Sequence, residues 1–176
     1  SLRKNACQIL LSDLHFSAIR GNASEIGTLS DLLTNSADTA KSFVDAPEAE
    51  IMQEKNLETC REKASCLSRY TDAFIVVSGK EDLVVHQDQC GMIRGGSPLS
   101  AQITGSGCML TELICLCMAA NPEDHWNAVY TAVHQMNLAA EKAARKTQAA
   151  DGGTMSFRMY LIDEISKQFT GGVPCL

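Results

Sequence analysis

The chain has 176 residues (19.0 kDa), of which 45% are hydrophobic and 20% charged, values typical of a globular protein that builds its own core. We expect a single domain over residues 1–176. The formal net charge of −6 and the lack of a dense Lys or Arg run disfavour nucleic acid and anionic membranes as partners. The longest apolar stretch, residues 109–120, contains Glu112 and is too short to span a bilayer. We therefore expect a cytoplasmic protein with no membrane partner.

Eight cysteines raise the question of disulfides or zinc, and their spacing argues against both. They are Cys7, Cys60, Cys66, Cys90, Cys108, Cys115, Cys117 and Cys175. No two form a C-x-x-C pair, and no neighbouring histidines complete a set of four ligands. We expect reduced thiols.

The start of the chain predicts a helix, a strand and a second helix in succession. Apolar residues recur at helical spacing over residues 2–10, and residues 16–19 have the composition of a short strand. The strand is followed by Arg20-Gly21-Asn22. Asn22 and Glu25 occupy the N-cap and N3 positions of a capping box, so a helix is predicted to begin there.

Three further strands are predicted in the middle of the chain. Residues 73–77 are a continuous, β-branched apolar run, typical of a strand buried on both faces of a largely parallel sheet. Residues 83–86 and 91–94 follow as a hairpin around the polar residues 87–89. Strands that alternate with helices predict an α/β layered architecture with an antiparallel hairpin added.

Further helices are predicted from apolar residues at helical spacing. One begins near residues 45–47, one covers residues 109–120, one follows Asn121-Pro122, and the last follows Gly152-Gly153. The helix over residues 109–120 is apolar almost throughout, whereas the other three each have one apolar face. The residues on these faces are Leu57, Cys60, Ala64 and Leu67 in the first helix, Trp126, Val129, Val133, Met136 and Ala140 in the helix after Pro122, and Phe157, Leu161, Ile165 and Phe169 in the last.

The sequence Gly105-Ser106-Gly107-Cys108, at the entrance to the helix over residues 109–120, predicts an anion site. Two glycines one residue apart, followed by a helical run, place several backbone N–H groups around a concavity at the positive end of a helix dipole. A thiol on the first helical turn lies in the same field. The alternative is a tight turn with a small buried cysteine.

A second group of polar residues follows predicted strand ends. Arg20 has the fork geometry to clamp a polyphosphate, and Glu25 could approach Mg²⁺ directly or through water. Glu25 could instead only cap its helix, which the spacing favours. Ser78, with Gly79 and Lys80, could offer a hydroxyl and a backbone N–H to a nucleotide, although a simple turn is the safer interpretation.

Taken together, these motifs resemble the hydroxyethylthiazole kinase family of the ribokinase-like superfamily. The matching motifs are Arg20-Gly21-Asn22 with Glu25, Val44-Asp45-Ala46, Val77-Ser78-Gly79, Thr104-Gly105-Ser106-Gly107-Cys108 and Gly152-Gly153-Thr154-Met155-Ser156-Phe157. The resemblance implies a three-layer α/β/α ribokinase-like fold. It also implies ATP-dependent phosphorylation of the hydroxyl of 4-methyl-5-(2-hydroxyethyl)thiazole, a step of thiamine biosynthesis or salvage.

On the acceptor side, the resemblance makes Cys108 the catalytic residue beside the substrate hydroxyl. Gly105 would contact the thiazole. The N–H groups of Gly105, Ser106 and Gly107, with that of Cys108, would form the anion hole for charge developing on the transferred phosphoryl group.

On the nucleotide side, the resemblance assigns Arg20, Asn22 and Ser78 to ATP binding. Ser78 stands where many members have threonine. Glu25, with Asn22, would belong to the Mg²⁺ and phosphate site. ATP and the thiazole alcohol are thus the expected small-molecule partners, and the family implies a trimer.

The chain also departs from the family pattern. Members begin with strands and helices that are absent here, including an acidic Mg²⁺ ligand and part of the thiazole site. We therefore expect about the C-terminal two thirds of the domain, with the N-terminal part of the sheet missing and slow turnover by the chain alone. Two alternatives remain: a non-catalytic remnant that binds nucleotide weakly, and a kinase for a hydroxymethylpyrimidine or pyridoxal-type alcohol.

Overall fold

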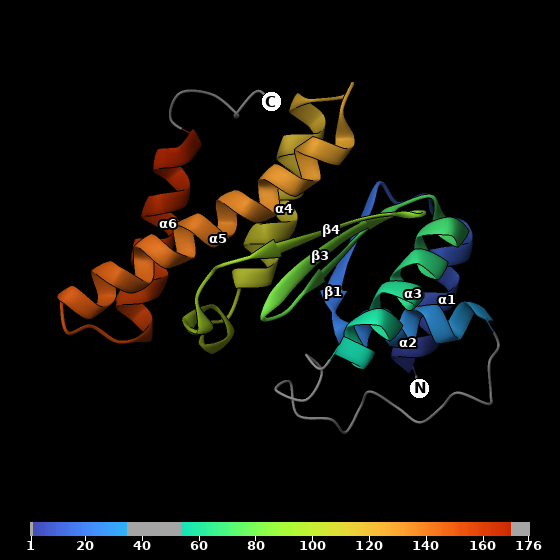
Figure 1. Cartoon of the computed structure of the whole chain (residues 1–176), viewed down its shortest axis with the longest axis horizontal. Helices are drawn as coiled ribbons and strands as arrows, with labels where there is room; N and C mark the ends of the chain where they lie inside the picture. Colours follow the sequence, from blue (N-terminus) through green and yellow to red (C-terminus); the bar gives the residue numbers. More distant parts are fainter. Residues whose placement is uncertain (1, 35–53, 170–176) are drawn as a thin grey trace. The chain divides into compact units, whose positions relative to one another are not determined.

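A computed structural model of the chain describes residues 2–34 and 54–169 (Figure 1). The chain divides into two compact units, residues 1–92 and 93–176. The expectation of one domain stays a prediction. None of the helices in the described residues is long and apolar enough to cross a membrane.

The first unit is an α/β layer built on a mixed sheet. Its elements are α1 (Leu2–Asp13), β1 (Ala18–Asn22), α2 (Ala23–Thr34), α3 (Glu54–Thr71), β2 (Phe74–Ser78), β3 (Glu81–His86) and most of β4 (Gln89–Arg94). The strand order is β1-β2-β3-β4, with β1 parallel and β3 antiparallel to β2. Figure 1 shows α2 and α3 on one face of these strands, where they pack against each other and against the sheet. The predicted α/β class is confirmed.

The core of this unit contains the apolar face predicted for α3. Cys60, Ala64 and Leu67 are buried with residues of β2 and β3, and Leu57 packs against them. Burial in this cluster raises the pKa of the Cys60 thiol to about 11, with a smaller increase from Cys90, while the positive charge of Lys63 acts in the opposite direction. The predicted start of this helix near residues 45–47 lies outside the described residues.

The first strand was placed too early by the sequence pattern. Residues 16–19 were expected, whereas β1 covers Ala18–Asn22, so Arg20 and Asn22 lie in the strand and not in a turn after it. The reason is the partner strand: Arg20 pairs with Val76 and Asn22 with Ser78, and this ladder keeps polar residues extended. An N-cap residue also has β-region dihedral angles, so β1 can run directly into α2.

The three other predicted strands are present with shifted bounds. Phe74 to Val77 of β2 are all buried, as expected for a strand covered on both faces. The hairpin between β3 and β4 turns at Gln87 and Asp88, and both strands begin two residues earlier than predicted.

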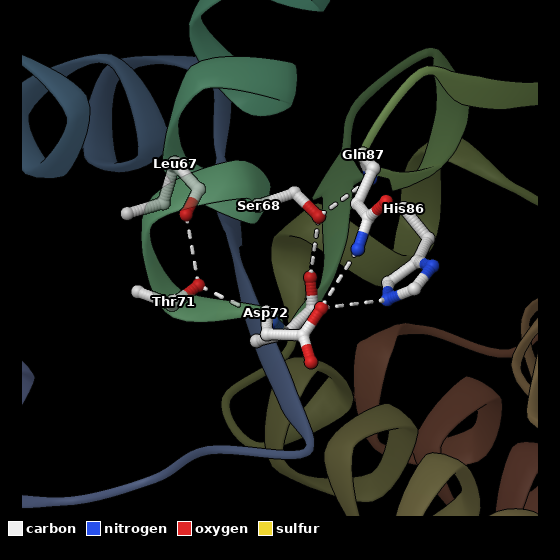
Figure 2. A network of polar contacts seen from close by, with 7 residues as sticks. Leu67, Ser68, Thr71, Asp72, His86 and Gln87 are labelled. Carbon is white, nitrogen blue, oxygen red and sulfur yellow. Dashed lines mark hydrogen bonds and ion pairs between the residues drawn. The ribbon is translucent and has the colours of Figure 1, made fainter.

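A polar network ties the end of α3 to this hairpin (Figure 2). Gln87 N donates to Ser68 Oγ at 2.8 Å, and that hydroxyl donates to the Ala73 carbonyl at 2.7 Å. Gln87 Nε2 donates to Asp72 Oδ1 at 2.8 Å. Asp72 and Gln87 have φ angles of +54° and +53°, a region that costs non-glycine residues free energy. The network holds both strained residues at the start of β2 and the end of β3, opposite the end that carries Ser78.

The second unit is mainly helical. Following the last residues of β4, it contains η2 (Pro98–Gln102), α4 (Ser106–Ala120), α5 (His125–Ala149) and α6 (Thr154–Phe169), and α5 packs against both α4 and α6. The predicted apolar faces are largely confirmed. Val129, Val133, Met136 and Ala140 are buried on α5, and Phe157 and Leu161 on α6.

An ion cluster joins the ends of α5 and α6. Lys146 contacts Glu164, and Lys167 Nζ lies 3.1 Å from Glu164 Oε1, while the Glu164 side chain is buried. Hydrogen bonds from Lys146, and next from Lys167, lower the pKa of Glu164. The pKa of Lys146 is raised by the same contact with Glu164.

Candidate active site

Arg20 and Ser78 come together at the carboxyl end of two parallel strands. Parallel pairing of β1 with β2 sets Arg20 beside Val76 and Asn22 beside Ser78. The Arg20 Nε–H donates to Ser78 Oγ at 2.9 Å, in a partly buried position. In open α/β sheets ligands bind outside the carboxyl ends of the strands. The side chains of Arg20 and Ser78 thus form one polar group where such a ligand would lie.

Asn22 and Glu25 form the predicted capping box. Asn22 N donates to Glu25 Oε2 at 2.8 Å, and Glu25 N donates to Asn22 Oδ1 at 2.8 Å. Because this box begins α2 immediately after β1, it places an exposed carboxylate beside the end of the strand that holds Arg20.

This carboxylate was also the expected magnesium ligand. Within the described residues no three His, Cys, Asp or Glu side chains gather at one metal site. Mg²⁺ in nucleotide sites commonly uses one or two carboxylates, phosphate oxygens and water, and Glu25 has a second oxygen beside the one that accepts from Asn22. One capping carboxylate is therefore compatible with a magnesium ion that arrives with a nucleotide.

Asp82 supports the turn after Ser78 and was missed in the sequence. The Gly79 N–H donates to Asp82 Oδ1 at 3.0 Å, and Asp82 is buried. This bond fixes the backbone one residue after the Ser78 hydroxyl. The signal that could have revealed it is an acidic residue three positions after Gly79, at the start of an otherwise apolar strand.

The glycine loop forms the first turn of α4. Gly105 is the N-cap, with φ +98°, and its carbonyl accepts the first helical hydrogen bond from Met109 N at 2.9 Å. Only glycine takes such a left-handed N-cap without strain. Ser106, Gly107 and Cys108 are the next three residues, and N–H groups at these positions have no acceptor within the helix. The loop therefore presents three aligned donors at the positive end of the dipole.

Cys108 is exposed on this first turn, so the alternative of a small buried cysteine is wrong. Cys117, on the same helix, is the buried thiol, and burial raises its pKa. The Ser106 hydroxyl donates to the Ser100 carbonyl at 2.9 Å, which ties the loop to η2. The Cys108 thiol and the donor N–H groups therefore share one helical turn, in which Cys108 is exposed and Ser106 and Gly107 are partly buried.

The predicted site residues thus form two groups, one in each unit. Arg20, Asn22, Glu25 and Ser78 lie together in the first unit, and Gly105 to Cys108 in the second. Val44-Asp45-Ala46 lies outside the described residues. Gly153, in the last matching motif, immediately precedes α6, and its carbonyl accepts from the N–H of the buried Phe157 at 3.0 Å. That part of the motif has a structural role.

Comparison with known proteins decides the family. The model of the hydroxyethylthiazole kinase family matches residues 1–170. The chain belongs to this family. It is 36% identical to a hydroxyethylthiazole kinase of Desulfovibrio desulfuricans over an alignment of 173 positions, which covers 94% of this chain and 59% of the relative. It is 34% identical to a hydroxyethylthiazole kinase of Methanobrevibacter smithii over an alignment of 169 positions, which covers 94% of this chain and 58% of the relative.

A solved structure shows the same fold. The hydroxyethylthiazole kinase of Pyrococcus horikoshii OT3 superposes with a TM-score of 0.69 at 22% identity, covering 94% of this chain and 54% of that one. The predicted α/β, ribokinase-like fold is thereby confirmed. The chain spans about three fifths of the length of the curated relatives it matches.

Proposed function

We propose that this protein phosphorylates the hydroxyl of 4-methyl-5-(2-hydroxyethyl)thiazole with ATP, a step of thiamine biosynthesis or salvage. The observation that carries the proposal is the first turn of α4, where an exposed Cys108 stands beside aligned N–H donors. Membership of the hydroxyethylthiazole kinase family supports the substrate.

In this mechanism Cys108 acts on the acceptor. Its sulfur orients the substrate hydroxyl or, as the thiolate, receives its proton, and the hydroxyl oxygen attacks the γ-phosphorus of ATP while the bond to ADP breaks. The N–H groups of Ser106, Gly107 and Cys108 stabilise the charge that develops on the transferred phosphoryl oxygens. Gly105 contacts the thiazole ring.

The nucleotide is held by residues of the first unit. Arg20 pairs with phosphate oxygens while its Nε–H stays bonded to Ser78, and Ser78 and Asn22 complete the nucleotide contacts. Glu25 would hold Mg²⁺, directly or through water, and the ion would neutralise charge on the phosphates. We further propose a single domain, a homotrimer and a cytoplasmic location, all from family resemblance.

The test is ADP release with and without the thiazole alcohol, measured on wild type, Cys108→Ala, Cys108→Ser and Cys115→Ala. Cys115 is exposed on the same helix and is the matched control. We expect Cys108→Ala to lower kcat by about 100-fold or more, the scale of a lost general base, with little change in ATP affinity. ADP release that the thiazole alcohol does not stimulate would refute the function. Equal rates for Cys108→Ala and Cys115→Ala would remove Cys108 from the reaction.

A further inference from the structure

A polar contact fastens the connection between β4 and the glycine loop to α5. The connection begins with Gly95 and Gly96, whose φ angles of +126° and +85° lie in the left-handed region. Gly96 N donates to Glu141 Oε1 at 3.0 Å. The backbone of a glycine turn is thus bonded to a long helix that buries residues along most of its length.

Two side chains of α5 cover this turn closely. A Cβ atom at Gly95 would lie 2.7 Å from Glu141 Oε1, and one at Gly96 would lie 3.0 Å from Asn137 Oδ1. Asn137 and Glu141 are four residues apart and therefore share one face of the helix. A side chain at either glycine would therefore have to displace the polar end of Glu141 or Asn137.

From Gly96 the chain reaches the glycine loop through η2. Ser97 caps η2, because its Oγ accepts from Leu99 N at 3.3 Å and its carbonyl accepts from Ser100 N at 3.0 Å. The Ser100 carbonyl then accepts from Ser106 Oγ at 2.9 Å. Glu141 is thereby connected to the first residue of α4 through one short, hydrogen-bonded segment.

We propose that Glu141 is a positioning residue for the glycine loop, acting through Gly96 and η2. The proposal rests on the proposed function, in which the N–H groups of residues 106–108 face the phosphoryl oxygens. Such donors stabilise a transition state because they are oriented before the reaction. A carboxylate accepts a stronger hydrogen bond than a neutral oxygen does, so Glu141 restrains the segment more firmly than a neutral side chain would.

The test is backbone amide exchange, followed by mass spectrometry of peptides covering residues 94–109. Glu141→Ala removes the acceptor, Glu141→Gln keeps an oxygen acceptor, and Glu123→Ala is an exposed acidic control in the same unit. We expect exchange in this segment to rise about tenfold or more in Glu141→Ala, the scale of a lost charge-assisted bond, to rise by a smaller factor in Glu141→Gln, and to stay near wild type in Glu123→Ala. Exchange in Glu141→Ala equal to that in Glu123→Ala would overturn the proposal.

A double-mutant cycle covers the case in which Glu141→Ala loosens the whole unit. Ser106→Ala breaks the other end of the path, and we expect its effect on exchange to shrink when Glu141 is already Ala. Additive effects would overturn the proposal. In ADP release assays kcat should fall in Glu141→Ala and recover in part in Glu141→Gln, and an unchanged kcat in Glu141→Ala would also overturn the proposal. Amide exchange is measured without substrate, so it tests the role of Glu141 even in a chain that has no kinase activity. A lack of kinase activity would refute the proposed function and leave the exchange result unaffected.

Discussion

Replacement of Glu25 by Gln and by Ala separates its capping role from a role in magnesium binding. Glu25 Oε2 accepts from Asn22 N at 2.8 Å, and Asn22 Oδ1 accepts from Glu25 N at 2.8 Å. Gln preserves the acceptor oxygen and loses only the charge, because capping boxes accept Glu or Gln at this position. Ala loses both the acceptor and the charge.

The expected stability changes follow from these losses. A net hydrogen bond contributes about 0.5–1.5 kcal/mol and a carboxylate at a helix N-terminus about 0.3–1 kcal/mol. Glu25→Gln should therefore lower the free energy of unfolding by about 0.3–1 kcal/mol, and Glu25→Ala by roughly 1–2 kcal/mol. Each kcal/mol corresponds to a fall in Tm of about 2–4 °C for a chain of this length.

Binding of Mg²⁺-ATP should follow a different pattern. If Glu25 holds the ion, Gln and Ala weaken binding alike, by about 10- to 100-fold, because both remove the charge. Isothermal titration calorimetry with and without Mg²⁺ measures this, and Glu62→Gln, an exposed charge loss on α3, is the control. Binding by Glu25→Gln equal to that by Glu62→Gln would refute the metal role. Unfolding free energies equal in Glu25→Gln and Glu25→Ala would refute the capping argument.

Two further predictions concern the second unit. Gly105→Ala should lower the free energy of unfolding by about 1–2 kcal/mol through backbone strain alone. Gly95→Ala should lower it by more, because the new Cβ atom must also displace Glu141 from the Gly96 N–H. Equal urea midpoints for the two variants would contradict this prediction. The pKa of Glu164 is lowered in the folded protein. The stabilisation that its ionised carboxylate contributes is therefore present above the unfolded-state pKa of about 4.3 and is lost as the pH falls through the lower pKa of the folded state. The stability gap between wild type and Glu164→Gln in urea unfolding should therefore be open at about pH 7 and should narrow as the pH falls below about 4.3, and a gap that stays constant on acidification would be inconsistent with the ion cluster.

Local features of the site could be predicted from the sequence, whereas distant contacts could not. The capping box of Asn22 and Glu25 joins residues three apart, and a left-handed Gly105 before a helix is visible as a motif. The hydrogen bond between Arg20 and Ser78 spans 58 positions, and it depends on the parallel register of β1 with β2. No pattern within either strand contains that register.

Residue spacing and short motifs predict the α/β class, the apolar faces of the helices, the buried strand β2 and the family, because a single segment carries each of these signals. Packing across the fold sets where β1 ends, leaves Cys108 exposed while it buries Cys117, and brings Glu141 to the Gly96 backbone. Each of these depends on which backbone or side chain a residue meets across the fold. Burial and long-range pairing are properties of the packed chain, so one segment read alone does not contain them.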